Sequence, residues 1–399
     1  MWQLTLRTAS LFLVTVLLGT LSGAAEEFQT PPPVRCLEFS PDGRLLVGSA
    51  ADQYTRGELV VWQVDTWKPR FRHQEPVGFP RVAFSPDGKQ LALSRFAPET
   101  KLFDVETGQL TQELQGHTDH ARCVTFTPDG KQIITGSYDL TVKIWNATSG
   151  DELATLEGYT SPVYHVAVSP DGSLLATADG RGSAVHLWDL KTHTKLHVFG
   201  NLGSLVPHVT FSPDGSLLAV ASWAGDLTLF DTKTYQPRHR IHRIGGVHWS
   251  AFSADNHWLA VVTNGTTVYV FPTDTSTDAK LNKEIADSLA KLEDDSYEVR
   301  EQATARLAAI GPAAVSQLVR AADSPSAEVR WRTRMLRQRM SRPESAAQIT
   351  GHLDQLECVC FSPDGTLLAS GDNTGHVKVW RVGTWEQIVS LAVIVKDEQ

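Results

Sequence analysis

A five-residue pattern repeats along the chain and limits the folds that the chain can adopt. An aromatic residue or Val, then Ser or Thr, then Pro-Asp-Gly occurs six times, and a degraded copy, Phe-Ser-Ala-Asp-Asn, makes a seventh. The copies start at residues 39, 84, 126, 168, 211, 252 and 361, so successive intervals are 45, 42, 42, 43, 41 and 109 residues. A period near 42 predicts an array of similar supersecondary units.

Each unit predicts four short antiparallel strands. Ser-Pro-Asp-Gly favours a type I turn, because Pro presets φ at the second position and Gly closes the turn. An apolar strand precedes this turn, as at residues 34–39, and another follows, as at 45–47. A fourth strand, such as 152–156, completes a sheet that is apolar on both faces and can be buried only against copies of itself. The third strand of each unit ends in an aromatic residue, in chain order Trp62, Phe103, Trp145, Trp188, Phe230, Phe271 and Trp380.

The third unit resembles the WD40-repeat family. Gly116-His117 precedes its first strand, Ser137 and Asp139 lie at its second turn, and Trp145 ends its third strand. In that family such a His, Ser, Asp and Trp hydrogen-bond one another inside the blade, and the resemblance implies the same role for these four residues. The fourth unit departs from the pattern with Gly158-Tyr159. The seventh keeps Gly351-His352 and Trp380 but has Thr374 where the family favours Asp.

This resemblance covers residues 34–278 and 346–399 and implies the fold class. We expect an all-β protein, a seven-bladed WD40-type β-propeller whose blades are four-stranded antiparallel sheets. Blades 1–6 begin within residues 34–278, and residues 346–399 supply the end of blade 6 and blade 7.

Residues 279–345 predict a small all-α insertion in the sixth unit. The hydrophobic period changes there from 2 to 3.6, with Ile285, Leu289 and Leu292 on one helical face. Further helices are predicted to start near Ser296, at Pro312 and at Ser324-Pro325. The segment 296–300 is echoed at 326–330, a repeat that resembles a pair of HEAT-like helical hairpins.

The last of these helices carries a run of arginines that includes Arg330, Arg334 and Arg337 on one stripe. One interpretation is a cationic surface that docks an anionic partner. The other is a solvated face whose arginines pair with Glu298, Glu301 or Glu328, as surface charge runs usually do.

Residues 1–25 predict a cleaved signal peptide. Arg7 precedes the apolar run Ala9–Leu21, and small residues at 22–25 suit a cleavage site. At about 1.5 Å per residue this run is too short to cross a hydrocarbon core of about 30 Å. We therefore expect a secreted or periplasmic protein with no membrane span after cleavage.

Charge and cysteine content limit the partners and the covalent structure. A net charge of −9 argues against nucleic acid as a partner. The four cysteines, Cys36, Cys123, Cys358 and Cys360, all precede a turn aromatic on a first strand. Buried free thiols are expected, with a Cys36–Cys358 bridge across the ring closure as the alternative.

Motifs for catalysis, metal binding or cofactors are absent from the sequence. It contains no Gly-x-Ser-x-Gly elbow, phosphate-binding glycine loop or His-Glu-x-x-His helix. His239 and His242 lie in an Arg-rich fourth strand, where a solvated face is expected instead of a metal site. We therefore assign no catalytic residue, no metal ligand and no cofactor.

The tips of the turns between second and third strands are the candidate binding residues. Counting seven residues back from each third-strand aromatic gives Phe96, Tyr138, Arg181 and Trp223 in four successive units. Aromatic and arginine side chains dominate interface energies. The alternative is that each ring folds onto a neighbouring blade and has only a structural role.

The sequence therefore favours a non-catalytic protein-interaction scaffold that presents its loop face to protein partners. A propeller enzyme of the lactonase or hydrolase type, with a site at the channel mouth, is one alternative. A carbohydrate- or cell-wall-binding lectin that uses Phe96, Tyr138 and Trp223 as stacking platforms is the other. Neither the identity of the partner nor the oligomeric state follows from the sequence.

Overall fold

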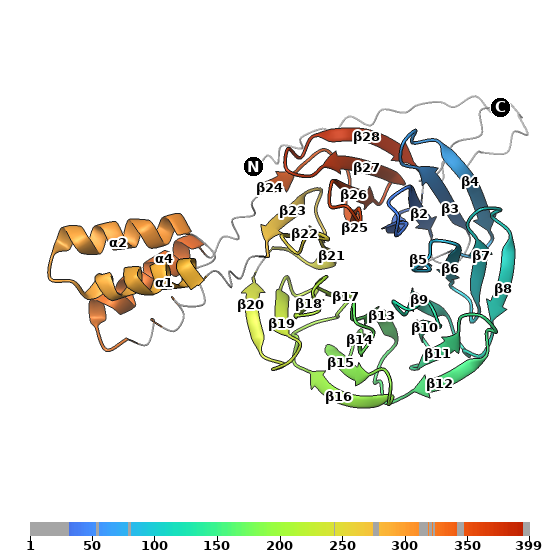
Figure 1. The fold of residues 1–399 in the computed structure, drawn as a ribbon, viewed down its shortest axis with the longest axis horizontal. Helices are drawn as coiled ribbons and strands as arrows, with labels where there is room; N and C mark the ends of the chain where they lie inside the picture. Colours follow the sequence, from blue (N-terminus) through green and yellow to red (C-terminus); the bar gives the residue numbers. More distant parts are fainter. Residues whose placement is uncertain are drawn as a thin grey trace, which may run out of the picture. The chain divides into compact units, whose positions relative to one another are not determined.

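The computed structural model describes residues 32–52, 56–78, 81–242, 244–273, 279–310, 318, 321, 324–340 and 347–393. Within them the chain forms seven four-stranded antiparallel sheets, the blades of a propeller that Figure 1 views along its axis. The prediction of a seven-bladed all-β propeller is confirmed. The predicted signal peptide, residues 1–25, lies outside the described residues.

The strands of each blade follow one another in chain order from the axis to the outer edge of the propeller (Figure 1). Blade 1 contains β1 (Val34–Phe39), β2 (Leu45–Ala51), β3 (Gly57–Gln63) and β4 (Pro69–Glu75). Blade 2 contains β5 (Arg81–Phe84), β6 (Gln90–Ser94), β7 (Thr100–Asp104) and β8 (Leu110–Leu114). Blade 3 contains β9 (Ala121–Phe126), β10 (Gln132–Ser137), β11 (Val142–Asn146) and β12 (Glu152–Leu156).

The later blades repeat this order. Blade 4 contains β13 (Val163–Val168), β14 (Leu174–Asp179), β15 (Ala184–Asp189) and β16 (Thr194–Phe199). Blade 5 contains β17 (His208–Phe211), β18 (Leu217–Ala221), β19 (Leu227–Asp231) and β20 (Pro237–Ile241). Blade 6 contains β21 (Val247–Phe252), β22 (Trp258–Thr263), β23 (Val268–Pro272) and β24 (Ala347–Ile349). Blade 7 contains β25 (Leu356–Phe361), β26 (Leu367–Asp372), β27 (His376–Arg381) and β28 (Gln387–Ala392).

The repeated Ser-Pro-Asp-Gly segments form the turns between first and second strands. In blade 1 the Ser40 hydroxyl donates to Asp42 Oδ1 at 2.6 Å and accepts from the Leu45 amide at 2.9 Å. Gly43 has a φ of 70°, and its equivalent in blade 6, Asn256, has a φ of 59°. This left-handed conformation favours Gly or Asn, which explains the last residue of the repeat.

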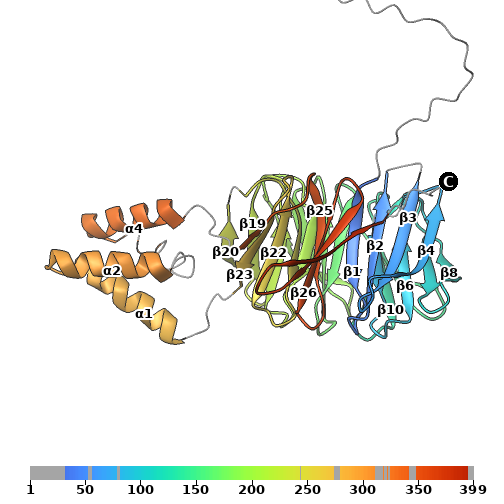
Figure 2. The ribbon, with the colours of Figure 1, turned by 90° about the horizontal axis from the view of Figure 1, so that it is seen from above.

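Neighbouring turns pack against one another around the ring. A Cβ added at Gly88 would lie 3.8 Å from Pro41 Cδ, and one added at Gly43 would lie 3.7 Å from Pro363 Cδ. The last blade therefore meets the first through the same contact that joins consecutive blades. Figure 2, a side view, shows strands such as β1, β2 and β25 running between the two faces of the ring.

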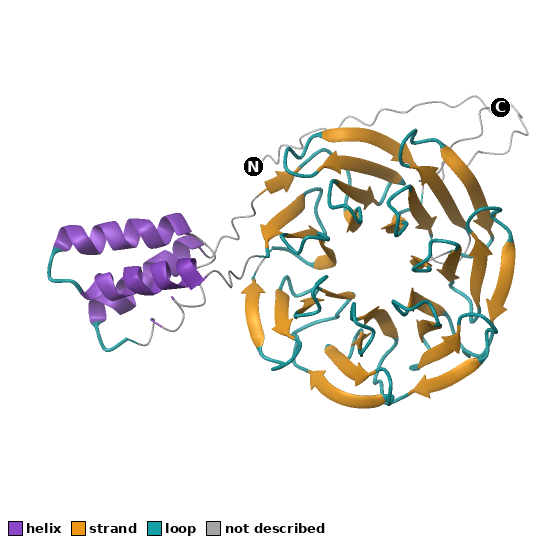
Figure 3. Ribbon diagram, in the orientation of Figure 1, coloured by secondary structure: helices purple, strands orange, loops and turns teal. Residues whose placement is uncertain are grey.

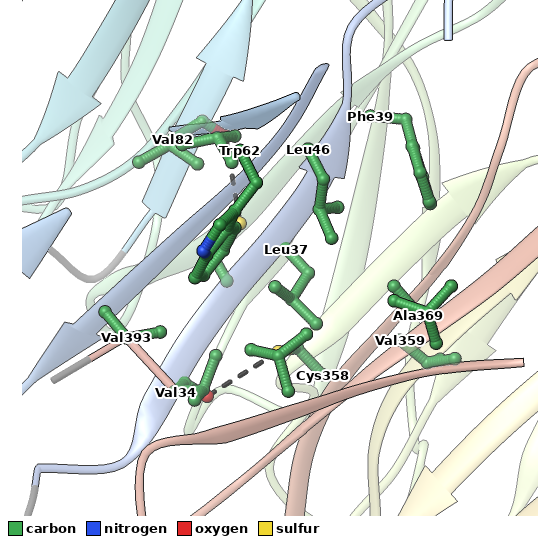
Figure 4. Close-up of a cluster of buried hydrophobic side chains, with 14 of the residues drawn as sticks. Val34, Leu37, Phe39, Leu46, Trp62, Val82, Cys358, Val359, Ala369 and Val393 are labelled. Carbon is green, nitrogen blue, oxygen red and sulfur yellow. Dashed lines mark hydrogen bonds between the residues drawn. The ribbon is translucent and has the colours of Figure 1, made fainter. Parts of the chain in front are cut away.

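Side-chain packing closes the ring between blades 7 and 1, because each blade takes its strands from consecutive parts of the chain. The Cys358 thiol lies 3.6 Å from the Val34 carbonyl oxygen, and Arg72 Nη1 donates to the Val393 carbonyl at 2.7 Å. Figure 4 shows Val34, Cys358 and Val393 together in this buried cluster. The closure therefore combines apolar packing with hydrogen bonds from side chains to backbone carbonyls.

The chain leaves blade 6 after its third strand and returns to complete it. β23 pairs with β24, with Val268 opposite Ile349. Three α-helices and one short 3₁₀ helix are described between these strands, α1 (Ala279–Ala290), η1 (Lys291–Glu293), α2 (Tyr297–Ile310) and α4 (Ala327–Met340). Figure 3 shows that helix is confined to this part of the described chain. A small helical insertion in the sixth unit is thus confirmed.

The helices share an apolar core of their own. Ile285, Leu292, Leu307 and Leu336 are each at most 1% exposed and pack together. α4 begins at Ala327 instead of Ser324-Pro325, because the Ser326 hydroxyl caps the helix by accepting from the Val329 amide at 3.3 Å. The predicted helix from Pro312 falls mostly outside the described residues, and the HEAT-like character stays a prediction.

Several arginines of the insertion have structural partners. Arg330 Nη1 donates to the carbonyls of Ser324 and Pro325, each at 2.7 Å. Arg332, which is buried, pairs with Glu301 at 2.8 Å and with Glu328 at 2.7 Å. Arg332 thus has glutamate partners, as in the second interpretation, but is buried and not solvated, and Arg330 pairs with backbone carbonyls and not with a glutamate.

The cysteines are free thiols, and the alternative of a Cys36–Cys358 bridge is wrong. Burial raises the pKa of Cys36 to about 11 and that of Cys123 to about 12. Both groups therefore stay protonated and unreactive near neutral pH. No helix among the described residues is long and apolar enough to cross a membrane.

Candidate functional site

A polar network lies inside blade 3, where the resemblance placed it. His117 Nδ1 lies 2.8 Å from Asp139 Oδ2, and His117 Nε2 lies 2.7 Å from Thr135 Oγ1. The Trp145 indole donates to the same hydroxyl at 2.8 Å. With Asp139 ionised, Nδ1 carries the proton and Nε2 accepts from Thr135, so every member of the chain has a partner. The network joins β10, β11 and the turn between them to the loop that precedes β9.

The structure assigns the central hydroxyl of this network to Thr135 and not to Ser137. Ser137 instead donates to the Asp119 carbonyl and accepts from the Asp139 amide, each at 3.0 Å. Side chains alternate along β10, so Thr135 and Ser137 share one face, but Thr135 is two residues nearer than Ser137 to Ile133, the residue paired with Trp145. Ser137 thus shapes the turn that carries Asp139, and its predicted place in the network is wrong.

Blade 7 repeats the network in full, a match that the sequence prediction missed. His352 Nδ1 lies 2.7 Å from Asp372 Oδ2, and His352 Nε2 lies 2.8 Å from Ser370 Oγ. Trp380 Nε1 donates to Ser370 at 2.9 Å. The prediction looked for the acid at Thr374, but the carboxylate comes from Asp372, two residues earlier on the strand.

Blade 4 keeps the hydroxyl and the tryptophan but changes the third partner. The Tyr159 hydroxyl lies 2.9 Å from Thr177 Oγ1, and Trp188 Nε1 donates to the same oxygen at 3.2 Å. Tyrosine therefore replaces the histidine of the other two networks. The three networks are buried and satisfied, and we assign them to the stability of the blades.

The predicted tip residues lie on one face of the propeller, where a recurring backbone hydrogen bond fixes the turn. The amides of Phe96, Tyr138 and Trp223 each donate at 3.0 Å to a carbonyl of the loop that leads into the same blade. In blade 4 the equivalent donor is Gly180, so Arg181 lies one residue beyond the pinned position and is exposed. We call Phe96, Tyr138, Arg181 and Trp223 the rim.

Each aromatic ring of the rim contacts a side chain of the next blade. Phe96 lies edge-on to His120 at 6.2 Å between ring centroids, and Tyr138 lies 6.0 Å from Tyr164. Trp223 stacks on His248 at 5.6 Å and is still 49% exposed. The rings are thus supported from below by neighbouring blades while part of their surface faces solvent.

Bulges on the innermost strands place a second set of side chains directly beneath the rim. The register of β1, β9, β13, β21 and β25 shifts at the same position, four residues before the first residue of the turn motif. A bulge leaves one residue unpaired and re-aims its side chain. The residues skipped in this way are Arg35, Arg122, Tyr164, His248 and Glu357, which we call the bulge ring.

The bulge ring is linked to the rim and across the ring closure. Arg122 lies between two aromatic rings, with Cζ 5.9 Å from the Phe96 centroid and 5.3 Å from that of Tyr164. Glu357 lies 3.4 Å from Arg35 Nη1 and 3.8 Å from His248 Nδ1. Five blades thus contribute to one cluster of charged and aromatic groups.

A layer of side chains from opposite blades crosses the axis next to the bulge ring. Arg81 of blade 2 places its guanidinium carbon 4.3 Å from the ring centroid of Trp249 in blade 6. His208 lies 3.9 Å from Trp249 and 4.2 Å from His165, between ring centroids. We call Arg81, His165, His208 and Trp249 the axial cluster.

Burial and the local positive charge set the protonation of this region. Burial, with Arg81 and Arg122 nearby, lowers the pKa of His165 well below its usual value, and burial likewise lowers that of His208. Burial and the charge of Arg122 lower the pKa of Arg81 to about 10. Both histidines are therefore neutral near pH 7, while Arg81 stays charged.

Two carboxyl groups reach this region, and they differ in charge. Burial opposes ionisation of Glu357, but His248 and Arg35 outweigh it and the pKa of Glu357 is lowered. Burial raises the pKa of Glu38 to about 8. Glu357 is thus ionised and paired near neutral pH, whereas Glu38 is largely protonated.

This arrangement suits recognition by shape and charge. In the described part of the chain, no three His, Cys, Asp or Glu side chains gather as metal ligands. The histidines of the axial cluster are packed against aromatic or histidine rings, which favours a fixed structure over proton transfer. What the face offers a ligand is aromatic surface at the rim and positive charge beneath it.

Sequence reasoning found the rim and missed the bulge ring. The signal was in the repeat: in five of the seven copies, the residue four positions before the start of the turn motif is Arg35, Arg122, Tyr164, His248 or Glu357, in an otherwise apolar strand. A polar residue at a regular place in a buried strand needs a partner or a ligand. Comparing the copies column by column would therefore have identified these five positions.

Comparison with known proteins agrees with this architecture. Residues 78–296 match the family model described as IFT122 first beta-propeller, and residues 17–56 and 343–381 match the WD domain, G-beta repeat. Among curated proteins, the angio-associated migratory cell proteins of Homo sapiens, Pongo abelii and Canis lupus familiaris are similar, each 43% identical over 53 residues. These matches cover 13% of this chain and only 12% of the length of each relative.

Proposed function

Because the chain belongs to the family of WD-repeat β-propellers described as IFT122 first beta-propeller, we propose that it is a non-catalytic scaffold that holds a protein partner. Propellers of this kind generally bind proteins. In this chain the partner rests on the rim formed by Phe96, Tyr138, Arg181 and Trp223.

The observation that carries the proposal is the exposed, supported aromatic surface of the rim. Trp223 is 49% exposed while its ring stacks on His248, so its position is fixed before any partner arrives. Leu353, in the loop that leads into blade 7, is 96% exposed. Rigid aromatic side chains bind with little loss of conformational entropy, which makes them effective anchors.

The proposal is tested by removing the anchors together. Tyr138→Ala with Trp223→Ala should weaken a captured partner about 30-fold or more, because two interface anchors are lost. A matched control is Leu153→Ala with Leu196→Ala, since both leucines are exposed on outermost strands, at 48% and 42%. Partners are captured with wild-type protein from the exported fraction, identified by mass spectrometry and then titrated against all three proteins.

Melting temperature separates binding from folding in this experiment. The rim variant should melt within about 2 °C of the wild type, because the removed rings are partly exposed. Equal affinity of the rim variant and the wild type would refute the proposal. A large drop in melting temperature would assign the rings to the interface between blades.

We also propose that the protein acts outside the cytoplasm. The support is the apolar run Ala9–Leu21, followed by small residues at 22–25. N-terminal sequencing of protein recovered from the exported fraction should begin near Glu26. A chain that starts at Met1 and stays with the cytoplasmic fraction would contradict this.

A further inference from the structure

Asn264 lies in an exposed turn of blade 6, between β22 and β23, and is followed by glycine. It comes seven residues before Phe271, so it holds the turn-tip position that Tyr138 and Trp223 hold in their blades. Its backbone amide donates to the Gly246 carbonyl at 3.0 Å, as the amides of those tips do in their own blades. The residue is exposed, and its side chain makes no hydrogen bond to a described residue. The side-chain amide is therefore open to water.

The backbone amide that follows the tip is where blade 6 differs from its neighbours. In blades 3, 5 and 7 this amide donates to the side chain of the residue before the tip, from Asp139 to Ser137 at 3.0 Å, from Ala224 to Ser222 at 3.2 Å and from Thr374 to Asp372 at 2.9 Å. In blade 6 the amide belongs to Gly265 and has no acceptor among the described residues. The nitrogen next to Asn264 is therefore not held by a hydrogen bond of the turn.

An asparagine beside such a nitrogen undergoes cyclisation. The Gly265 nitrogen forms a bond to Asn264 Cγ, the bond from Cγ to Nδ2 breaks, and Nδ2 leaves as ammonia with the proton of the Gly265 amide. Water then opens the five-membered imide at one of its two carbonyl carbons. Attack of water at Cγ gives aspartate, and attack at the backbone carbonyl gives isoaspartate. Glycine favours the first step, because it has no Cβ to hinder the nitrogen.

We infer that Asn264 is a site of spontaneous modification, at which water converts the asparagine of the folded protein into aspartate and isoaspartate. The inference rests on the exposed side-chain amide, on the unbonded nitrogen beside it and on the glycine that carries this nitrogen. Water is the only co-reactant, so the reaction does not depend on whether the rim binds a partner.

Two other asparagines of the described chain provide an internal contrast. Asn373 is the tip of blade 7, but the amide that follows it is held by Asp372. Asn146 lies in the turn after β11, and its Oδ1 accepts from two backbone amides at 2.9 and 3.0 Å. Neither is followed by glycine. Both should therefore stay asparagine under conditions in which Asn264 is converted.

Conversion of Asn264 changes the loop face beside the rim. A Cβ added at Gly246 would lie 3.3 Å from the Trp223 carbonyl oxygen and 3.7 Å from Asn264 Nδ2, so Gly246 has both residues as neighbours. Either product adds a negative charge there, because an exposed carboxyl group is ionised near neutral pH. Isoaspartate also lengthens the backbone before Gly265, whose carbonyl accepts from the Leu356 amide of β25 at 2.9 Å. The modification thus alters the charge of the face and a link between blades 6 and 7.

The test follows the three asparagines in the folded, full-length protein during incubation at mildly alkaline pH in water enriched in heavy oxygen. Each conversion takes up an oxygen atom from water, so the label separates conversion during incubation from conversion during digestion. Mass spectrometry of the peptides measures each site, and enzymatic methylation of isoaspartate detects the second product. Asn264 should be converted at least about 10-fold faster than Asn146 or Asn373.

Gly265→Ala is the matched variant. A Cβ at Gly265 would have only Thr263 Oγ1 nearby, at 3.6 Å, and the φ of Gly265 lies outside the left-handed region. The variant should therefore fold and melt like the wild type, while its Cβ slows the conversion of Asn264 about 10-fold or more.

Two results would overturn the inference. One is an Asn264 that stays an amide in the folded wild type over the time in which the urea-unfolded chain converts it. The other is equal conversion of Asn264 in the wild type and in Gly265→Ala. Neither result depends on the capture experiment on the rim.

Discussion

The interior of blades 3 and 7 and the axis of the ring both bury polar groups, but they treat them differently. In the blades, His117 and His352 each have a carboxylate on one ring nitrogen and a hydroxyl on the other. At the axis, the Nε and Nη1 atoms of Arg122 and the Nδ1 atom of His165 have no hydrogen-bond partner among the described residues. Satisfied networks belong to the fold, whereas the axis groups side chains of several blades that no single sheet can satisfy.

The difference follows from how the two regions are built. The blade networks lie within one sheet, so the repeat itself supplies all the partners. The axis is assembled from several blades that each contribute one or two side chains, and its residues differ from copy to copy. One repeated module can therefore keep its stability in the sheets and still vary the side chains at the centre.

The largest expected effect is the loss of a network tryptophan. Trp145 is 1% exposed and donates to Thr135, so Trp145→Ala should destabilise the protein by about 3–5 kcal/mol. Trp331→Ala, on the helical insertion where the side chain is 58% exposed, is the control and should change stability by less than about 0.5 kcal/mol. Chemical denaturation of both variants checks this, and equal stabilities would remove Trp145 from the core.

A smaller effect separates Thr135 from Ser137. Thr135→Val keeps the shape but leaves His117 Nε2 and Trp145 Nε1 without their shared hydroxyl, which should cost about 2–4 kcal/mol. Ser137→Ala removes only contacts within the turn and should cost about 1 kcal/mol. If urea denaturation showed that Ser137→Ala is the more destabilised variant, Ser137 and not Thr135 would be the central hydroxyl of the network.

Acid should loosen blade 7 through Asp372. Burial disfavours its ionisation, but hydrogen bonds from His352 and Thr374 lower its pKa to about 2 from an ordinary value of 3.8. Its folded-state pKa is depressed, so its contribution is complete above about pH 4 and is lost as the pH falls toward 2. This contribution is about 2 kcal/mol.

The measurement is the free energy of unfolding between pH 5 and pH 2. Wild-type protein should lose about 2 kcal/mol more over this range than Asp372→Asn, which cannot titrate at that position. Parallel curves for the two proteins would show that Asp372 is not stabilised by ionisation.

Much of the propeller could be predicted from the sequence because its determinants are local. Pro-Asp-Gly turns, alternating apolar strands and the aromatic end of each third strand lie within one repeat, and seven copies gave the blade number. The rim positions of Phe96, Tyr138 and Trp223 follow from the same counting. Arg181 lies one residue beyond the turn position whose amide is hydrogen-bonded, because in blade 4 that amide belongs to Gly180.

What the sequence could not supply depends on several blades at once. The contact of Arg81 with Trp249 exists only once the ring is closed, because the two residues come from blades 2 and 6. The choice of Thr135 over Ser137 depends on the register of β10 and β11, which pairs Ile133 with Trp145. Such relations are set by register and ring radius, which no single repeat specifies.

The distinction between the blade interior and the loop face is tested most directly by measuring Thr135→Val and the rim variant, Tyr138→Ala with Trp223→Ala, side by side for stability and for partner affinity. Thr135→Val should melt well below the wild type and keep its affinity for the captured partner, because it removes a hydroxyl from a buried network. The rim variant should melt close to the wild type and bind the partner about 30-fold more weakly or worse. A rim variant that loses as much stability as Thr135→Val and keeps its partner affinity would contradict the account.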